Sequence, residues 1–172
     1  MINFTMLIIL TICLFTDLRE RKIYNIVIFP ALVVAIGSNA WMDGLSGLWF
    51  SVTGFVVGFM ILLIPYFMGG MGAGDVKLLA LIGALKGVMF VLTTAIFMAI
   101  IGGVMGVLIL LFRKGAIKRI KSILFSAACI KMGMKIPLMI DKDGLKTTYP
   151  YGVAIVGGAI ISLLNREWVL LW

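Results

Sequence analysis

The sequence lacks histidine altogether and contains only two cysteines, Cys13 and Cys129, far apart in the chain. Without histidine, Ser-His and Cys-His catalysis and every metal site built on imidazole are excluded. The cysteines form no C-x-x-C pair, so a zinc site made of thiolates is not expected either. We therefore expect no metal and no other cofactor, and catalysis would have to use other side chains.

Charged residues are scarce as well. They make up 13% of the 172 residues, and 63% of the residues are hydrophobic. A typical soluble domain has about 25% charged residues, so this composition is typical of a membrane protein. The chain is too short for two membrane domains, and we predict one membrane-embedded domain over residues 1–172. The net charge of +8 does not indicate nucleic-acid binding, because most basic residues flank apolar stretches.

Six uncharged, apolar stretches predict an all-α membrane bundle of about six transmembrane helices. They cover residues 1–16, 23–42, 48–68, 78–85, 87–112 and 147–165. Since a helix needs about 20 residues to cross the hydrocarbon core, the fourth stretch is too short. Either Asp75 and Lys77 lie below the membrane surface, or that helix runs past Lys86. The sequence leaves both alternatives open.

The basic residues are distributed unevenly between the two ends of these stretches. With alternating crossings, 13 of the 15 lysines and arginines fall on the side of Lys77 and the loops 19–22, 69–75 and 113–146. The positive-inside rule places that side in the cytoplasm and both chain ends outside, in the inner (cytoplasmic) membrane. Residues 113–147 form a basic segment in which isoleucines recur at helical spacing. This predicts an amphipathic helix on the anionic lipid surface, with packing against the bundle as the alternative.

Of the seven acidic residues, Asp17 and Asp75 are the two that abut apolar helix ends on the side predicted to be cytoplasmic. Asp17 closes the first stretch and Asp75 opens the fourth, so two complete crossings separate them and both fall on the cytoplasmic side. An ionisable residue at membrane depth is costly, which makes it a functional candidate. Two carboxylates that lie close together share one proton, so one can activate water while the other polarises a carbonyl group. A structural alternative is that Asp75 caps a helix and Asp17 pairs with Arg21.

The residues before Asp75 are rich in glycine and read Gly69-Gly-Met-Gly-Ala-Gly-Asp75. Glycine permits unusual backbone angles and lets another backbone come close, which would suit a protease that holds an extended substrate. A flexible loop between helices is the alternative. Glycines also recur at four-residue spacing, as in Gly54 with Gly58, which allows helices to pack closely within the monomer or across a dimer seam.

Three segments of the chain resemble the type IV prepilin peptidases, a family of GxGD membrane aspartyl proteases. Gly72-Ala-Gly-Asp75 has the G-x-G-D motif of these enzymes. Asp17-Leu-Arg-Glu-Arg-Lys-Ile-Tyr-Asn25 resembles the family's first-aspartate segment, and Tyr149-Pro-Tyr-Gly-Val-Ala154 resembles its motif near the last helix. A G-x-G-D motif alone is unspecific, whereas three matches in family order over most of the chain are specific.

The resemblance implies a role for each matched residue. Asp17 and Asp75 would be the catalytic pair. Gly72 and Gly74 would shape the loop that positions Asp75. Lys77 would lie beside the pair, where it would tune the acids or contact the substrate backbone.

Asn25 is grouped with these supporting or substrate-binding residues. The family usually has proline where this chain has Tyr24, which loosens the turn before Asn25. Family members cut a short basic leader from type IV pilin-like precursors, after a glycine, at the cytoplasmic membrane face. The apolar helix of the precursor stays in the lipid bilayer.

The larger, bifunctional members have a cytoplasmic region with paired cysteines and a methyltransferase activity. This chain has no such region, so the resemblance implies the short form with peptidase activity alone. Two other functions are weighed against it. One is a GxGD-type intramembrane protease that acts on other membrane proteins. The other is a small ion or solute transporter in which Asp75 binds a cation, which would predict inverted repeats that the sequence does not show.

Overall fold

The computed structural model describes residues 2–20, 23–112 and 151–165, and the regular secondary structure in them is α-helical throughout. The helices are α1 (Ile2–Glu20), α2 (Asn25–Phe67), α3 (Ala73–Phe112) and α5 (Tyr151–Leu164). The prediction of an all-α protein is confirmed for this part of the chain. The chain divides into two compact units, Met1–Gly102 with Pro150–Trp172, and Gly103–Tyr149. The features described below belong to the first unit, apart from the part of α3 that follows Gly102.

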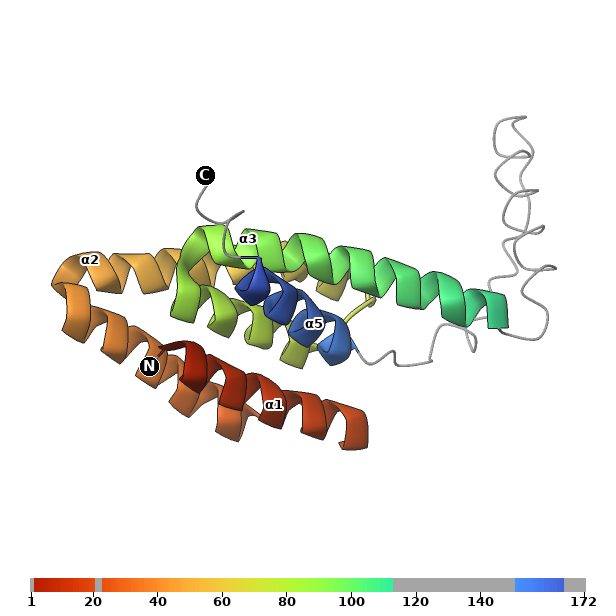
Figure 1. Ribbon diagram of the computed structural model, residues 1–172, viewed down its shortest axis with the longest axis horizontal. Helices are drawn as coiled ribbons and strands as arrows, with labels where there is room; N and C mark the ends of the chain where they lie inside the picture. The colour runs from red at the N-terminus through yellow and green to blue at the C-terminus, as the bar shows by residue number, and fades with distance from the viewer. Residues whose placement is uncertain (1, 21–22, 113–150, 166–172) are drawn as a thin grey trace, which may run out of the picture. The chain divides into compact units, whose positions relative to one another are not determined.

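Helix α2 contains a sharp reversal at Gly44. The backbone there has φ 61° and ψ −135°, a positive-φ conformation that is open to glycine. Along a straight helix Asn39 and Ser51 would be about 18 Å apart. Instead, Asn39 Nδ2 donates a hydrogen bond of 2.8 Å to Ser51 Oγ. The two arms, residues 25–43 and 45–67, therefore fold back on one another, as the bend of α2 in Figure 1 shows.

Helix α3 reverses in the same way at Gly87, where φ is 81° and ψ is −178°. A β-carbon at this position would also lie 2.2 Å from the ring of Phe50, so a side chain here would force that ring to move as well. The arm that begins at Ala73 thus ends at Lys86. It does not run straight past Lys86, which was one of the two alternatives for this short stretch.

The second arm of α2 and the first arm of α3 pack backbone against backbone. A β-carbon at Gly54 would lie 2.0 Å from the carbonyl oxygen of Gly83, and one at Gly83 would lie 2.0 Å from that of Gly54. One turn further along α2, a β-carbon at Gly58 would lie 2.6 Å from the carbonyl oxygen of Leu79. Helices approach this closely only where side chains are absent. Gly54 and Gly58 therefore serve packing within the monomer.

A small group of neutral polar side chains, which we call the Asn39 cluster, connects three of these arms. Asn39 is 5% exposed and Ser51 is fully buried. Asn39 Nδ2 donates both to Ser51 Oγ and, over 3.1 Å, to the carbonyl oxygen of Ala84 in α3. Buried polar groups need hydrogen-bond partners, and the cluster supplies them where the chain reverses.

Large apolar side chains cover the outside of the helices as well as the inside. Trp41, Ile26 and Leu164 are 92%, 81% and 81% exposed. A water-soluble monomer rarely shows such wide apolar surface, so this surface favours contact with lipid. By length and composition, two of the described helical segments could cross a membrane, Asn25–Phe67 and Ala73–Leu108.

Some predictions concern features that the described residues do not test. The basic amphipathic segment at 113–147 lies outside the described residues. The single domain over residues 1–172, the number of six crossings and the location of both chain ends outside stay predictions.

Candidate active site

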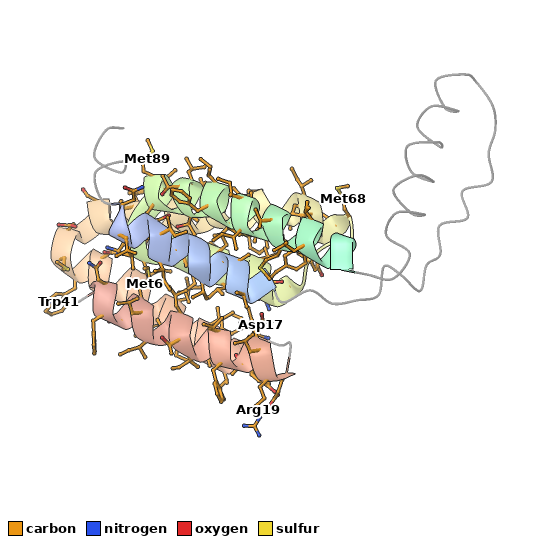
Figure 2. The ribbon with its side chains drawn as sticks, turned by 45° about the vertical axis from the view of Figure 1, so that its right-hand side comes forward. Met6, Asp17, Arg19, Trp41, Met68 and Met89 are labelled. Carbon is orange, nitrogen blue, oxygen red and sulfur yellow. The ribbon has the colours of Figure 1, made fainter. Side chains whose placement is uncertain are left out.

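Asp17 lies in the last turn of α1 and is only 6% exposed, although Leu18 beside it is 60% exposed. Figure 2 shows it close to the end of α1. Its carboxylate lies directly against the first turn of α5. A β-carbon built on Gly152 would be 2.5 Å from Asp17 Oδ2 and 2.8 Å from Asp17 Cγ. The side chain of Asp17 thus points into the protein, toward the N-terminal end of α5.

Asp75 lies in the first turn of α3 and is 8% exposed. Its Oδ2 accepts a hydrogen bond of 3.1 Å from the backbone N–H of Gly72. The carbonyl oxygen of Gly72 in turn accepts from the N–H groups of Asp75 and Val76. Gly72 therefore caps the helix and Asp75 reaches back to it, as glutamate does in a capping box. Asp75 helps to start its helix, and this bond fixes the direction of its carboxylate.

Asp17 and Asp75 come from helices that are separated by all of α2, yet they lie close enough for their charges to interact. Both are almost excluded from water. Like charges repel in a low-dielectric setting, so each carboxylate disfavours the ionised form of the other. Within residues 2–20, 23–112 and 151–165, no three potential metal-ligating side chains of histidine, cysteine or acid type gather together.

The glycine-rich segment before Asp75 is the connection between α2 and α3. Gly69 has φ 75°, and Gly70 donates a hydrogen bond of 2.9 Å to the carbonyl oxygen of Pro65, so the segment turns tightly out of α2. A β-carbon at Gly74 would lie 2.9 Å from Cβ of Ile23, which precedes α2. The missing side chain of Gly74 therefore lets the first turn of α3 lie against the connection between α1 and α2, next to the acid-bearing end of α1.

Lys77 and Asn25, both predicted as supporting residues, contact one another. Lys77 Nζ donates a hydrogen bond of 2.9 Å to Asn25 Oδ1 and lies 5.8 Å from the centre of the Phe29 ring. The ammonium group thus faces the start of α2 and links that helix to α3. Tyr24, at the position where the family usually has proline, caps α2. Its hydroxyl donates to the carboxylate of Glu20, and this hydrogen bond raises the pKa of Tyr24.

Gly152 contacts Asp17 but has no predicted role of its own. The signal for it was present, since Gly152 belongs to the third segment, Tyr149-Pro-Tyr-Gly-Val-Ala154. Its contact with Asp17 depends on how α1 packs against α5, and sequence spacing alone does not indicate that packing.

A strongly apolar helical protein with two buried, interacting carboxylates has the groups that a membrane-associated acid–base enzyme needs. Residues 4–111 match the family model for the type IV leader peptidase family, and the chain belongs to that family. The match covers more than half of the chain and includes Asp17 and Asp75. No curated protein and no solved structure matches the chain.

Family membership confirms the resemblance found in the sequence. The protein is therefore a peptidase of the leader-peptidase type. Prepilin-like proteins are in general the substrates of this family. The two long apolar helices of the protein agree with membrane association.

Proposed function

We propose that the protein is an aspartic endopeptidase that removes the basic leader from type IV pilin-like precursors at the cytoplasmic face of the inner membrane. Asp17 and Asp75 are its catalytic pair. The observation that carries this proposal is the burial of two interacting carboxylates at the ends of α1 and α3. Membership of the type IV leader peptidase family supplies the class of substrate.

The proposed chemistry needs one proton in the pair. The ionised carboxylate takes a proton from a water molecule, and the water oxygen attacks the scissile carbonyl carbon. The protonated carboxyl donates its proton to the carbonyl oxygen, which gives a neutral tetrahedral intermediate. When the C–N bond breaks, the carboxyl that took the proton from water donates it to the amine of the apolar product. The ionised partner takes a proton from one hydroxyl of the intermediate, which collapses to the carboxylic acid of the leader and leaves the pair with one proton again. Because the two acids act together, neither role is assigned to one of them.

The lengths of the helical arms support a location of the pair near a membrane surface. The two arms of α2 have about 19 and about 23 residues, or roughly 28 and 34 Å of helix, close to the roughly 30 Å of the hydrocarbon core. The first arm of α3 has about 14 residues, or roughly 21 Å. An arm this short would hold Asp75 slightly below the surface, where the apolar helix of a precursor meets its basic leader. The excess of basic residues at this end favours the cytoplasmic side.

The supporting residues have separate roles in this proposal. Gly72 directs the carboxylate of Asp75 through its N–H group. Gly74 leaves room for the connection after α1. Lys77 and Asn25 join α3 to α2 at the edge of the site, within reach of a bound leader. The activity is cleavage alone, and methylation of the new N-terminus would require another protein.

The direct test replaces Asp17 and Asp75 singly by Asn. The substrate is a precursor with a basic leader ending in glycine, followed by an apolar helix, in membranes that contain the full-length protein. Either change should lower the rate of cleavage by about 10³-fold or more, since acid–base groups of this kind contribute about 10²–10⁴-fold each. The folded protein should persist, because asparagine at position 75 can still accept the hydrogen bond from Gly72.

Gly37→Ala is the matched control, because a β-carbon at Gly37 would have nothing within 4 Å. It should cleave like the unchanged protein. Normal cleavage by the Asp75→Asn protein would contradict the proposed mechanism. A second substrate, an apolar helix without a leader, distinguishes the leader peptidase from the alternative, an intramembrane protease. If this substrate is cut equally well, the protein is an intramembrane protease with broader substrates.

A further inference from the structure

Gly152 stands in an exceptional position on α5. A β-carbon there would be 2.5 Å from Asp17 Oδ2, 2.8 Å from Asp17 Cγ and 3.1 Å from Asp17 Cβ. The three nearest atoms thus all belong to one proposed catalytic side chain. To reach an ordinary contact distance of 3.4 Å, the carboxylate oxygen would have to move by about 1 Å. Glycine is therefore required at this position because of Asp17.

Two other glycines of α5 show that this is a special case. A β-carbon at Gly157 would be 3.0 Å from Ile101 Cδ1, the mobile end of a flexible side chain. A β-carbon at Gly158 would be 2.7 Å from the backbone oxygen of Thr94. The first contact can adjust, and the second concerns only the packing of α5 against α3. Gly152 alone among the three faces an acid.

The location at the first turn of α5 has an electrostatic consequence. Asp17 lies in the last turn of α1, where the partial negative charge of the helix end disfavours a carboxylate. Gly152 lies in the first turn of α5, where the helix dipole gives a partial positive charge that favours a carboxylate. The absence of a side chain at Gly152 brings the carboxylate to the favourable end of the second helix.

We propose that Gly152 is a positioning residue for catalysis, which holds the carboxylate of Asp17 against the start of α5 and so at its place beside Asp75. This inference rests on the proposed function, and it adds a residue outside the region that matches the family model, residues 4–111. It also gives the segment from Tyr149 to Ala154 a physical role. Helix α5 completes the active site because its glycine admits the first acid.

A double-mutant cycle tests the contact itself, without any assay of cleavage. Gly152→Ala should lower the midpoint of thermal unfolding in detergent by roughly 4–8 °C, the effect of moderate overpacking in a chain of this size. In a protein that also carries Asp17→Ala, the same change should have less than half of that effect, because the atoms it meets are gone. Gly158→Ala should lower the midpoint of thermal unfolding by the same amount with and without Asp17→Ala.

Equal losses for Gly152→Ala in both backgrounds would overturn the proposal. If Gly152→Ala prevents the otherwise unchanged protein from accumulating in membranes, Asp17→Ala must restore accumulation. Failure to restore it would overturn the proposal as well.

Kinetics then test the positioning role. The full-length protein is placed in vesicles of phosphatidylethanolamine and phosphatidylglycerol with a synthetic precursor that has a basic leader ending in glycine. A displacement of a catalytic group by about 1 Å lowers kcat by about 10²-fold, and we expect this for Gly152→Ala, with KM changed less than about threefold. Gly157→Ala should keep both constants within about twofold. Gly158→Ala should reduce the amount of folded protein and leave kcat per folded molecule unchanged.

The outcomes separate this inference from the proposed function. If Gly152→Ala retains its kcat while Asp17→Asn is inactive, the positioning role is wrong and the catalytic pair stands. If Asp17→Asn cleaves normally, the catalytic pair is wrong, and the stability cycle still decides whether Gly152 makes room for Asp17.

Discussion

The two ends of the helical arms bury polar side chains to a similar degree but with opposite chemistry. At the reversals of α2 and α3, Asn39 and Ser51 are 5% and 0% exposed, are neutral and bond to one another. Where α1 ends and α3 begins, Asp17 and Asp75 are 6% and 8% exposed, are acidic and repel one another. Figure 2 labels Trp41 beside the first reversal of α2 and Asp17 near the end of α1.

This difference teaches where stability and activity reside. A buried polar group with neutral partners stabilises the fold, because an unmade hydrogen bond would be costly. Two buried carboxylates that interact destabilise the fold. Such pairs are typical of functional sites, where a reaction requires them. Substitutions at the Asn39 cluster should therefore affect unfolding, and those at the acids should affect cleavage.

The strongest test of this comparison exchanges the chemistry of the two ends. Asn39→Asp removes the amide donor and buries a carboxylate next to Ser51 Oγ and the carbonyl oxygen of Ala84. We expect a loss of about 3 kcal/mol or more in the free energy of unfolding at neutral pH. The loss should shrink in acid, where the introduced carboxyl holds a proton and can donate a hydrogen bond. Unfolding in detergent at several pH values measures it.

Asp75→Asn is the opposite exchange and serves as the partner experiment. It should remove cleavage without lowering the free energy of unfolding, because it abolishes the repulsion with Asp17. If Asn39→Asp were harmless and Asp75→Asn unfolded the protein, the comparison would be wrong.

A large effect is also expected where α2 and α3 touch. Gly83→Ala would place a β-carbon 2.0 Å from the carbonyl oxygen of Gly54, so the two arms must separate. We expect a loss of about 2–3 kcal/mol in the free energy of unfolding. Gly37→Ala, in an open position of α2, should instead stabilise the protein by about 0.5–1 kcal/mol. Equal unfolding midpoints for the two variants would contradict the backbone contact.

A smaller effect should follow from Gly44→Ala. A β-carbon at Gly44 would meet nothing within 4 Å, so the loss comes only from its φ of 61°. We expect about 1–2 kcal/mol. Ser46→Ala, two residues further along, should change stability by less than about 0.5 kcal/mol. Cleavage per folded molecule should stay normal in both variants, since this end takes no part in the proposed mechanism. A drop in kcat for Gly44→Ala would argue against the separation of the two ends.

The smallest effect is expected for the link between Lys77 and Asn25. Lys77→Met and Asn25→Ala each remove the same solvent-exposed hydrogen bond, which contributes about 0.5–1 kcal/mol to the free energy of unfolding. Because the ammonium group is bonded to Asn25, cleavage should fall by less than about tenfold, far less than after Asp17→Asn. If the double variant loses no more unfolding free energy and no more cleavage activity than either single variant, the two residues act through the hydrogen bond between them.

Much of the fold was predictable from the apolar stretches. The break between residues 42 and 48 contains the reversal at Gly44, because a glycine between two apolar stretches indicates a turn. The stretch at 78–85 was too short, because the charged residues Lys77 and Lys86 were taken as its limits. The helix begins at Ala73 instead, since Asp75 bonds back to Gly72 and is a favourable residue in a first turn.

The two acids of the candidate site could be predicted from the sequence, whereas the residues that contact them could not. Counting crossings placed Asp17 and Asp75 at the same end, and the G-x-G-D motif pointed to the second acid. Lys77 was expected beside the acids, and its hydrogen bond to Asn25 follows from how α2 packs on α3. The contact of Gly152 with Asp17 likewise follows from helix packing between distant parts of the chain, which residue spacing does not encode.

The glycine contact between α2 and α3 limits the paths by which small molecules can travel. With Gly54 and Gly83 touching through their main chains, neither a lipid tail nor a solvent molecule fits into that seam. The water consumed in the proposed hydrolysis therefore does not reach the acids between these two arms. The end of α3 that carries Asp75 is a route that this seam leaves open to both the solvent and the leader of the precursor.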